Sequence, residues 1–155
     1  MKNIKPRIID YIFMGLAVLC FLFTLIYGCA KLPQLPDLLP SHYNFAGEID
    51  GWSGKVGAVS APMVIGFLVL VIMGPVLFFP QVWNNTQGIP AYKIPRVVRS
   101  TRTCISFLLF LTEAFFVYTL VCTVHSTPLH AFVSPLYMGL LFADTAWILI
   151  QTFRK

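Results

Sequence analysis

Charged residues are scarce in this sequence. Lys, Arg, Asp and Glu together make up 11% of the 155 residues, whereas hydrophobic residues make up 57%. Mean hydropathy is correspondingly high, at +0.78. Soluble globular domains carry about 25% charged and about 45–50% apolar residues, so this composition excludes an ordinary soluble domain. It predicts one domain, residues 1–155, that lies in a lipid bilayer.

Familiar catalytic and metal-binding motifs are also missing. The four cysteines form no CxxC pair, no HExxH motif is present, and a P-loop is excluded because Ile49 and Val56 stand where it needs Gly and Ser or Thr. Cys29 and Cys122 both fall near the expected outer surface, where a disulfide between them is an open alternative to two free thiols. The sequence therefore leaves open whether the protein is an enzyme.

The apolar residues are gathered into four long runs. A helix needs about 20 apolar residues to cross the ~30 Å hydrocarbon core, and the runs lack the alternation of a membrane barrel. An open strand in lipid would leave its backbone donors and acceptors without partners. The sequence therefore predicts an all-α, integral membrane four-helix bundle. The spans are expected at about residues 8–30, 59–79, 103–125 and 132–151.

The basic residues are divided unevenly among the connections. Of the eleven Lys and Arg residues, only Lys31 and Lys55 lie between the first two spans. The positive-inside rule then predicts cytoplasmic N- and C-termini and an extracytoplasmic first connection, which explains the charge without a nucleic-acid partner. Arg96, Arg99 and Arg102 are spaced three apart, so we expect them on one helix face. Attraction to anionic lipid headgroups explains this stripe, and docking of a cytoplasmic protein is the alternative.

Residues 31–58, between the first two spans, are predicted to form an ordered, Pro/Gly-rich extracytoplasmic loop. Prolines at positions 33, 36 and 40 favour a polyproline-like course, which would place Leu32, Leu35 and Leu38 along one side. Glycines at 47, 51 and 54 indicate tight turns. The polar side chains that we expect to bind a ligand follow the prolines: His42, Asn44, Glu48, Asp50 and Lys55.

The run LPDLLPSHYN, residues 35–44, followed by Gly47, Asp50, Gly51 and Gly54-Lys55, resembles the signature of a bacterial membrane family, domain of unknown function 1648. The resemblance covers about twenty residues and the placement of the flanking helices. That family includes the N-terminal half of SdpI-type proteins, which protect a bacterium from its own secreted peptide toxin and can sequester a repressor at the membrane. SdpI-type proteins carry further helices, so this resemblance is partial.

The resemblance implies a multi-pass protein of the bacterial inner (plasma) membrane. It further implies a binding, immunity or signalling module that recognises an extracytoplasmic peptide, such as a toxin, or a lipid through the signature loop. The rival hypothesis is a metal-dependent membrane enzyme. In it His42, His125 and His130, with Glu48 or Asp50, would supply zinc ligands at the outer face.

Two acidic residues fall inside the predicted spans. Glu113 and Asp144 lie roughly 15 and 10 Å from the expected cytoplasmic surface, at 1.5 Å per residue, so they could meet. An ionised carboxylate in lipid costs at least ~2.5 kcal/mol, which favours a neutral acid or a shared proton. One hypothesis is a proton-coupled transporter subunit, which four helices would build as a homo-oligomer. The alternative is a pair of hydrogen-bonded structural acids.

Overall fold

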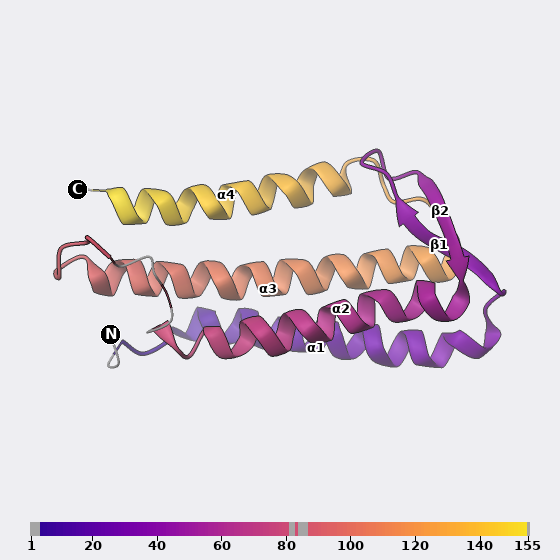
Figure 1. Ribbon diagram of the computed structural model, residues 1–155, viewed down its shortest axis with the longest axis horizontal. Coiled ribbons are helices and arrows are strands. Elements are labelled where there is room, and N and C mark those ends of the chain that lie inside the picture. Colours follow the sequence, from indigo (N-terminus) through magenta and orange to yellow (C-terminus); the bar gives the residue numbers. More distant parts are fainter. Residues whose placement is uncertain (1–3, 81–82, 84–86, 155) are drawn as a thin grey trace.

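The computed structural model describes residues 4–80, 83 and 87–154. Its four long helices run side by side (Figure 1). All four are long and apolar enough to cross a membrane, so the chain is a multi-pass membrane protein, as predicted. The helices are α1 (Ile8–Lys31), α2 (Lys55–Val76), α3 (Ile94–His125) and α4 (Val133–Phe153).

The helix bounds differ from the predicted spans mainly at α3, which begins at Ile94 rather than at residue 103. Its first turns carry few apolar residues, so hydropathy alone placed the start too late. Val97 and Val98 are nonetheless fully buried on one side, while Arg96 and Arg99 stay exposed on the other. An amphipathic helix of this kind is stabilised by tertiary packing rather than by lipid.

The expectation of an all-α fold is wrong between α1 and α2. There the chain forms two antiparallel strands, β1 (Leu38–Tyr43) and β2 (Ile49–Gly54), which close as a hairpin over one end of the bundle (Figure 1). Each strand supplies hydrogen-bond partners for the other. This end is called the hairpin end below, and the opposite one, which carries both chain termini, is the terminal end.

The polyproline-like course is also wrong. Residues Leu32–Gln34 form a single 3₁₀ turn, η1, and the chain then enters β1. Leu32 and Leu35 pack against a buried cluster formed by Leu39, Ala58, Val59 and Leu120. Leu38 is instead 59% exposed, because alternation in a strand turns it away from Leu39. The three leucines therefore do not line one side.

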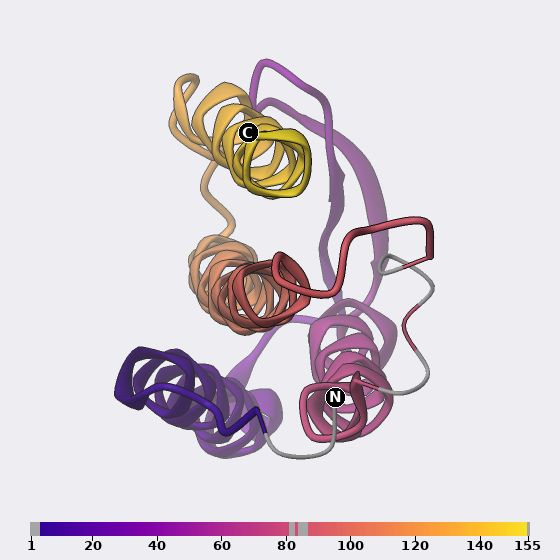
Figure 2. The same cartoon turned by 90° about the vertical axis from the view of Figure 1, so that its left-hand side faces the viewer.

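The helices pack as a group of three with a fourth at the edge. Seen from the terminal end, α1, α2 and α3 form a triangle and α4 lies on α3, away from the other two (Figure 2). None of the residues of α4 is buried within the protein.

All four cysteines are free, so Cys29, which is exposed, and Cys122, which is buried, form no disulfide.

Polar contacts tie the helices together at the terminal end. Arg102 is 2% exposed, and its guanidinium donates hydrogen bonds to the carbonyl oxygens of Leu77 (2.9 Å) and Ile4 (3.0 Å). Asp10, 3% exposed, accepts a hydrogen bond from the backbone N–H of Arg7 (2.7 Å) and another from the hydroxyl of Thr103. Arg102 thus points into the protein, so the predicted stripe of three arginines is reduced to Arg96 and Arg99.

The hairpin is fixed to the α3–α4 connection at its turn. The carbonyl of Gly47 accepts a hydrogen bond from the backbone N–H of Leu129 at 2.8 Å. Gly47 has φ +86°, a left-handed conformation that glycine adopts without strain. A Cβ atom at this position would also lie 2.5 Å from the Leu129 carbonyl oxygen. Glycine is therefore required here both by conformation and by space.

We expect Gly47→Ala to lower the free energy of unfolding by at least about 1–2 kcal/mol, the cost of a left-handed L-residue. Gly139→Ala is the matched control, because a Cβ atom on Gly139 of α4 meets nothing within 4 Å. That variant should keep wild-type stability or gain slightly in helix propensity. Thermal unfolding of the purified proteins in detergent measures both. Equal stability of the two variants would contradict this account of Gly47.

Candidate functional site

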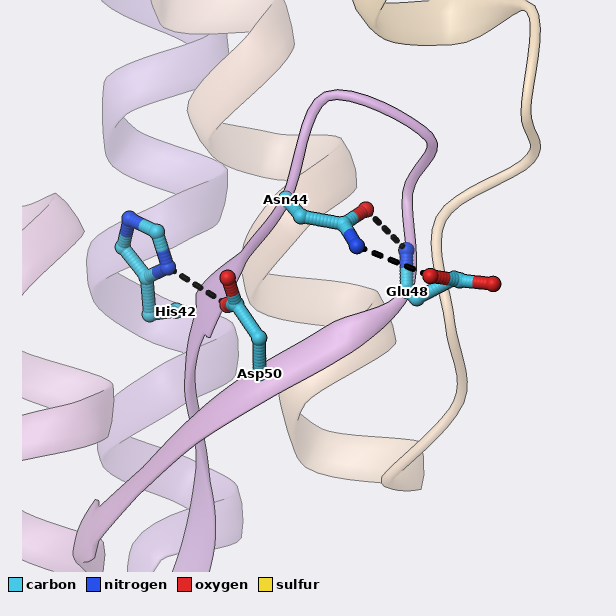
Figure 3. Close-up of polar contacts among 4 residues, drawn as sticks. All are labelled: His42, Asn44, Glu48 and Asp50. Atoms are coloured by element: carbon cyan, nitrogen blue, oxygen red, sulfur yellow. Dashed lines mark hydrogen bonds and ion pairs between the residues drawn. The ribbon is translucent and has the colours of Figure 1, made fainter.

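Two irregularities in the hairpin bring His42 and Asp50 together. Pro40 pairs with Trp52 and His42 pairs with Gly51, so Ser41 has no partner on β2. Tyr43 then pairs with Ile49, so Asp50 has no partner on β1. Bulges of this kind re-aim side chains and occur often beside functional sites. Here His42 Nδ1 lies 2.5 Å from Asp50 Oδ1 (Figure 3).

The His42–Asp50 pair remains accessible to water. Its side chains are 71% and 42% exposed, respectively. Gly51 lies opposite His42, and a Cβ atom on Gly51 would come within 2.8 Å of His42 Cβ, so the glycine permits the close approach of the two strands here. Exposed ion pairs contribute about 0–1 kcal/mol to stability, so the fold does not depend on this one. Its polar atoms are available to a ligand.

Asn44 and Glu48 shape the turn between the strands. Their backbones and side chains are both joined: Asn44 N–H donates to the Glu48 carbonyl at 2.9 Å, and Glu48 N–H donates to Asn44 Oδ1 at 3.0 Å. Asn44 Nδ2 also donates to Glu48 Oε2 at 2.8 Å (Figure 3). These contacts give the two side chains a structural role in the turn.

Lys55 fastens the start of the hairpin to the first turn of α2. Its ammonium group donates to the carbonyl oxygen of Leu35 at 3.2 Å and lies 3.1 Å from Asp37 Oδ1. Its backbone N–H donates to the Asp37 carbonyl at 2.9 Å. Of the five ligand-binding residues predicted from the sequence, Asn44, Glu48 and Lys55 therefore serve the shape of the hairpin.

β1 also contacts the bundle through Tyr43. The Tyr43 hydroxyl lies 3.1 Å from the hydroxyl of Thr123 on α3. Burial raises the pKa of Tyr43 above its usual value near 10, and the contact with Thr123 lowers it only in part. The tyrosine therefore stays neutral at physiological pH and acts as a hydrogen-bonding anchor.

A cleft of about 250 Å³ lies beside β1, between the hairpin and the helices. Its walls are mostly apolar, with Pro62 and Ile65 from α2 and Phe115 and Phe116 from α3. Hydroxyl groups are spaced along it, and the hairpin residues that line it all come from β1. The polar lining residues are Ser41, His42, Tyr43, Thr119, Thr123 and Ser134.

This cleft was not anticipated from the sequence, although one signal for it was available. Small residues occupy α2 where it passes under β1, namely Ala58 and Ala61, and both line the cleft. Residues three apart share a helix face, so two alanines there leave space that larger side chains would fill. Alanine counts as apolar like the larger residues, so apolar content did not reveal this space.

The three histidines have separate neighbours. His125 Nε2 lies 3.2 Å from the hydroxyl of Tyr27, and the His130 ring lies 4.8 Å from that of Phe132, while His42 pairs with Asp50. Among the described residues, no group of three or more His, Cys, Asp or Glu side chains gathers in a way that could hold a metal ion. The hypothesis of a zinc site on His42, His125 and His130 therefore gains no geometric support from this part of the chain.

The two acids inside the spans lie among different neighbours. Glu113 is fully buried against α2, where a Cβ atom on Gly66 would come within 2.8 Å of Glu113 Oε2. The backbone carbonyl of Asp144 faces Cys104 Sγ, at 3.7 Å. Cys104 and Glu113 are nine residues apart on α3, which is about 13 Å along a helix. Both Glu113 carboxyl oxygens and Asp144 Oδ2 are buried without a hydrogen-bond partner among the residues that the structure describes.

Comparison with known proteins confirms the resemblance in one part of the chain. Residues 19–66 match the model of a family described as "Domain of unknown function (DUF1648)". The matched segment is less than a third of the chain and contains the end of α1, the whole hairpin and the first half of α2. No curated protein and no solved structure matches the chain.

The division of roles in the hairpin can be tested by stability. Asn44→Ala removes two side-chain hydrogen bonds, each worth about 0.5–1.5 kcal/mol, so we expect the free energy of unfolding to fall by about 1–3 kcal/mol. His42→Ala breaks only the exposed pair and should change it by less than about 1 kcal/mol. Thermal unfolding in one detergent compares them. A greater loss from His42→Ala than from Asn44→Ala would contradict the assignment.

Proposed function

We propose that this protein binds an apolar peptide segment in the cleft beside β1, with the His42–Asp50 pair as the polar contact at its rim. The observation that supports this most is the position of the cleft: it lies against one strand of a two-stranded sheet and is bordered by an exposed polar pair. Apolar clefts with a few convergent polar groups are the usual form of a ligand site.

The size of the cleft favours part of a ligand rather than a whole small molecule. Its volume of about 250 Å³ falls below the range of roughly 300–1,000 Å³ that is typical of small-molecule pockets. One or two bulky apolar side chains suit such a space. The rest of the ligand then lies outside, along β1.

The strand supplies a second reason to favour a peptide. An extended peptide can add to the edge of an exposed sheet through main-chain hydrogen bonds, with alternate side chains entering pockets beside the strand. All three hairpin residues that line the cleft, 41–43, belong to β1, and Ser41 has no partner on β2. An apolar side chain of a peptide lying along β1 would face the cleft.

The charge distribution supports an orientation. Of the nine basic residues that the structure describes, seven lie at or near the terminal end, and Lys31 and Lys55 lie at the hairpin end. By the positive-inside rule the termini are cytoplasmic and the hairpin is extracytoplasmic. In the bacterial inner membrane the cleft would then meet a peptide that arrives from outside, as an immunity or signalling module requires.

A photoactivatable peptide tests the proposal. The probe is a synthetic apolar nonapeptide that carries one photo-leucine, added to the full chain in nanodiscs. Ala61→Trp should reduce labelling at least tenfold, because the indole fills the cleft that Ala61 lines. Ala143→Trp is the matched control, since Ala143 is exposed on α4 away from the cleft, and it should label like the wild type.

Two outcomes would overturn the peptide-binding proposal. In one, the peptide labels Ala61→Trp and the wild type equally, while Ala61→Trp and Ala143→Trp both keep the wild-type unfolding temperature. In the other, a photoactivatable fatty acid labels the residues of the cleft and the peptide does not, which would identify a lipid site instead.

A second function, a proton-coupled transporter subunit, is favoured by one observation. Glu113 is fully buried in the bundle, and within the described part of the chain neither of its carboxyl oxygens has a hydrogen-bond partner. An ionised carboxylate in such surroundings is costly, so the neutral acid is favoured. A buried acid of this kind can bind and release a proton when the protein changes shape.

Modification with a hydrophobic carbodiimide tests this second function. Dicyclohexylcarbodiimide adds to a protonated carboxyl group in apolar surroundings, so we expect an adduct on Glu113 in the intact protein and none on the exposed Glu48. Peptide mass spectrometry locates the adduct, and Glu113→Gln should remove it. A site that exchanges protons should label more slowly as the pH of the medium rises, and a rate independent of pH would argue for a purely structural acid.

A further inference from the structure

A second hollow lies at the terminal end, away from the proposed peptide cleft. It has a volume of about 460 Å³ and is formed where the start of α1, the first turns of α3 and the last turns of α4 meet. Three arginines line it, together with two aromatic residues and a serine hydroxyl: Arg7, Arg96, Arg99, Tyr92, Trp147 and Ser100. We call it the arginine pocket.

The arginine pocket carries uncompensated positive charge. None of the residues that line it is acidic. Within the described part of the chain, the ion pairs join His42 to Asp50 and Lys55 to Asp37, both at the hairpin end. The nearby carboxylate of Asp10 is buried and engaged with the Arg7 backbone and Thr103. An anion in this pocket would therefore meet guanidinium groups without acidic partners.

One of the three arginines is held in place by the fold. Arg7 Nη2 donates to the carbonyl oxygen of Arg99 at 3.3 Å and to the hydroxyl of Thr103. This contact brings a residue before α1 to α3, beside Arg96 and Arg99. Arg7 thus takes the place that sequence spacing had given to Arg102, which is buried and directed to other partners. Fixing the side chain in advance reduces the entropy lost when a ligand binds.

The surroundings of the pocket favour a lipid headgroup as the anion. Tyr92 and Trp147 are 78% and 52% exposed, and such aromatic residues are enriched where a membrane meets water. The pocket lies between two helices that can cross the membrane, so the lipid chains would run along α3 and α4. The first turns of α3 add the positive end of a helix dipole, which also attracts an anion.

We propose that the arginine pocket binds the phosphate headgroup of an anionic phospholipid. Guanidinium groups bind phosphate oxygens in pairs of charge-assisted hydrogen bonds, and basic pockets between membrane helices suit such headgroups. Among the described residues, none pairs with the guanidinium group of Arg96 or Arg99; Arg7 is held beside them by Arg99 and Thr103, and Ser100 offers a hydroxyl. This site is independent of the peptide cleft at the other end.

Native mass spectrometry of the full chain in a neutral detergent tests the proposal, with phosphatidylglycerol or phosphatidylcholine added. We expect the wild type to retain phosphatidylglycerol at least tenfold more than phosphatidylcholine. R96Q/R99Q should retain at least fivefold less phosphatidylglycerol than the wild type. K31Q is the control, because it removes one positive charge at the hairpin end, and it should bind like the wild type. R96Q alone, which changes one exposed side chain, should show an intermediate loss.

Measuring the unfolding temperature distinguishes loss of lipid binding from loss of folding. It also distinguishes binding of the lipid from binding of free phosphate. Phosphatidylglycerol should raise the unfolding temperature of the wild type and of K31Q but not of R96Q/R99Q, whose unfolding temperature without lipid should match the wild type. If the double variant proves unstable, the test rests on the lipid retention and the unfolding temperature of R96Q. Equal retention of the two lipids by the wild type would overturn the proposal. So would wild-type binding by both arginine variants, or stabilisation by inorganic phosphate equal to that by phosphatidylglycerol.

Discussion

Lipid offers no hydrogen-bond partner to a backbone N–H or carbonyl group, and the whole structure follows from that constraint. Inside the membrane the chain must form helices, whose backbone groups pair within the same segment. Where the chain leaves the membrane, its backbone can also pair with other strands, with side chains or with water. At the hairpin end it pairs two strands, and at the terminal end it satisfies carbonyl oxygens with the Arg102 guanidinium. Specific chemistry is therefore concentrated at the two ends.

The hairpin shows how a short signature can encode the shape of a turn while leaving a polar pair exposed. Asn44 and Glu48 form the turn, Gly47 permits its left-handed residue, and Lys55 ties the chain to α2. Those residues lie within the family match, but their contacts are internal. His42 and Asp50 have little to stabilise, because their pair is exposed and sits at two bulges that weaken the strand ladder. An exposed polar pair that contributes little to the fold is a candidate for contact with a ligand.

How far the sequence predicts this molecule depends on the range of the interactions. The four spans were predictable, since hydropathy is a local property and lipid enforces it. The hairpin was not, because Pro40 and the glycines within β2 are poor strand formers, and the strands form only through their pairing across residues 38–54. Spacing could not distinguish the exposed His42 from Asn44, whose side chain bonds to Glu48 within the turn. The cleft and the inward turn of Arg102 depend on contacts between distant segments.

Helix α4 connects the two ends in a way that follows from its packing. No residue of α4 is buried within the protein, and the helix lies on α3 alone in the end view (Figure 2). Its first turn lines the cleft beside β1 through Ser134, and its last turns line the arginine pocket through Trp147. The α4 helix is held on α3 by a stacked pair of rings, Phe115 and Tyr137, whose centroids lie 4.4 Å apart, and by the hydroxyls of Thr112 and Tyr137, 3.3 Å apart. Coupling between the two ends would require that the ligands at both ends distinguish the same two positions of α4, and linkage then makes the two effects equal: each ligand changes the affinity for the other by the same factor.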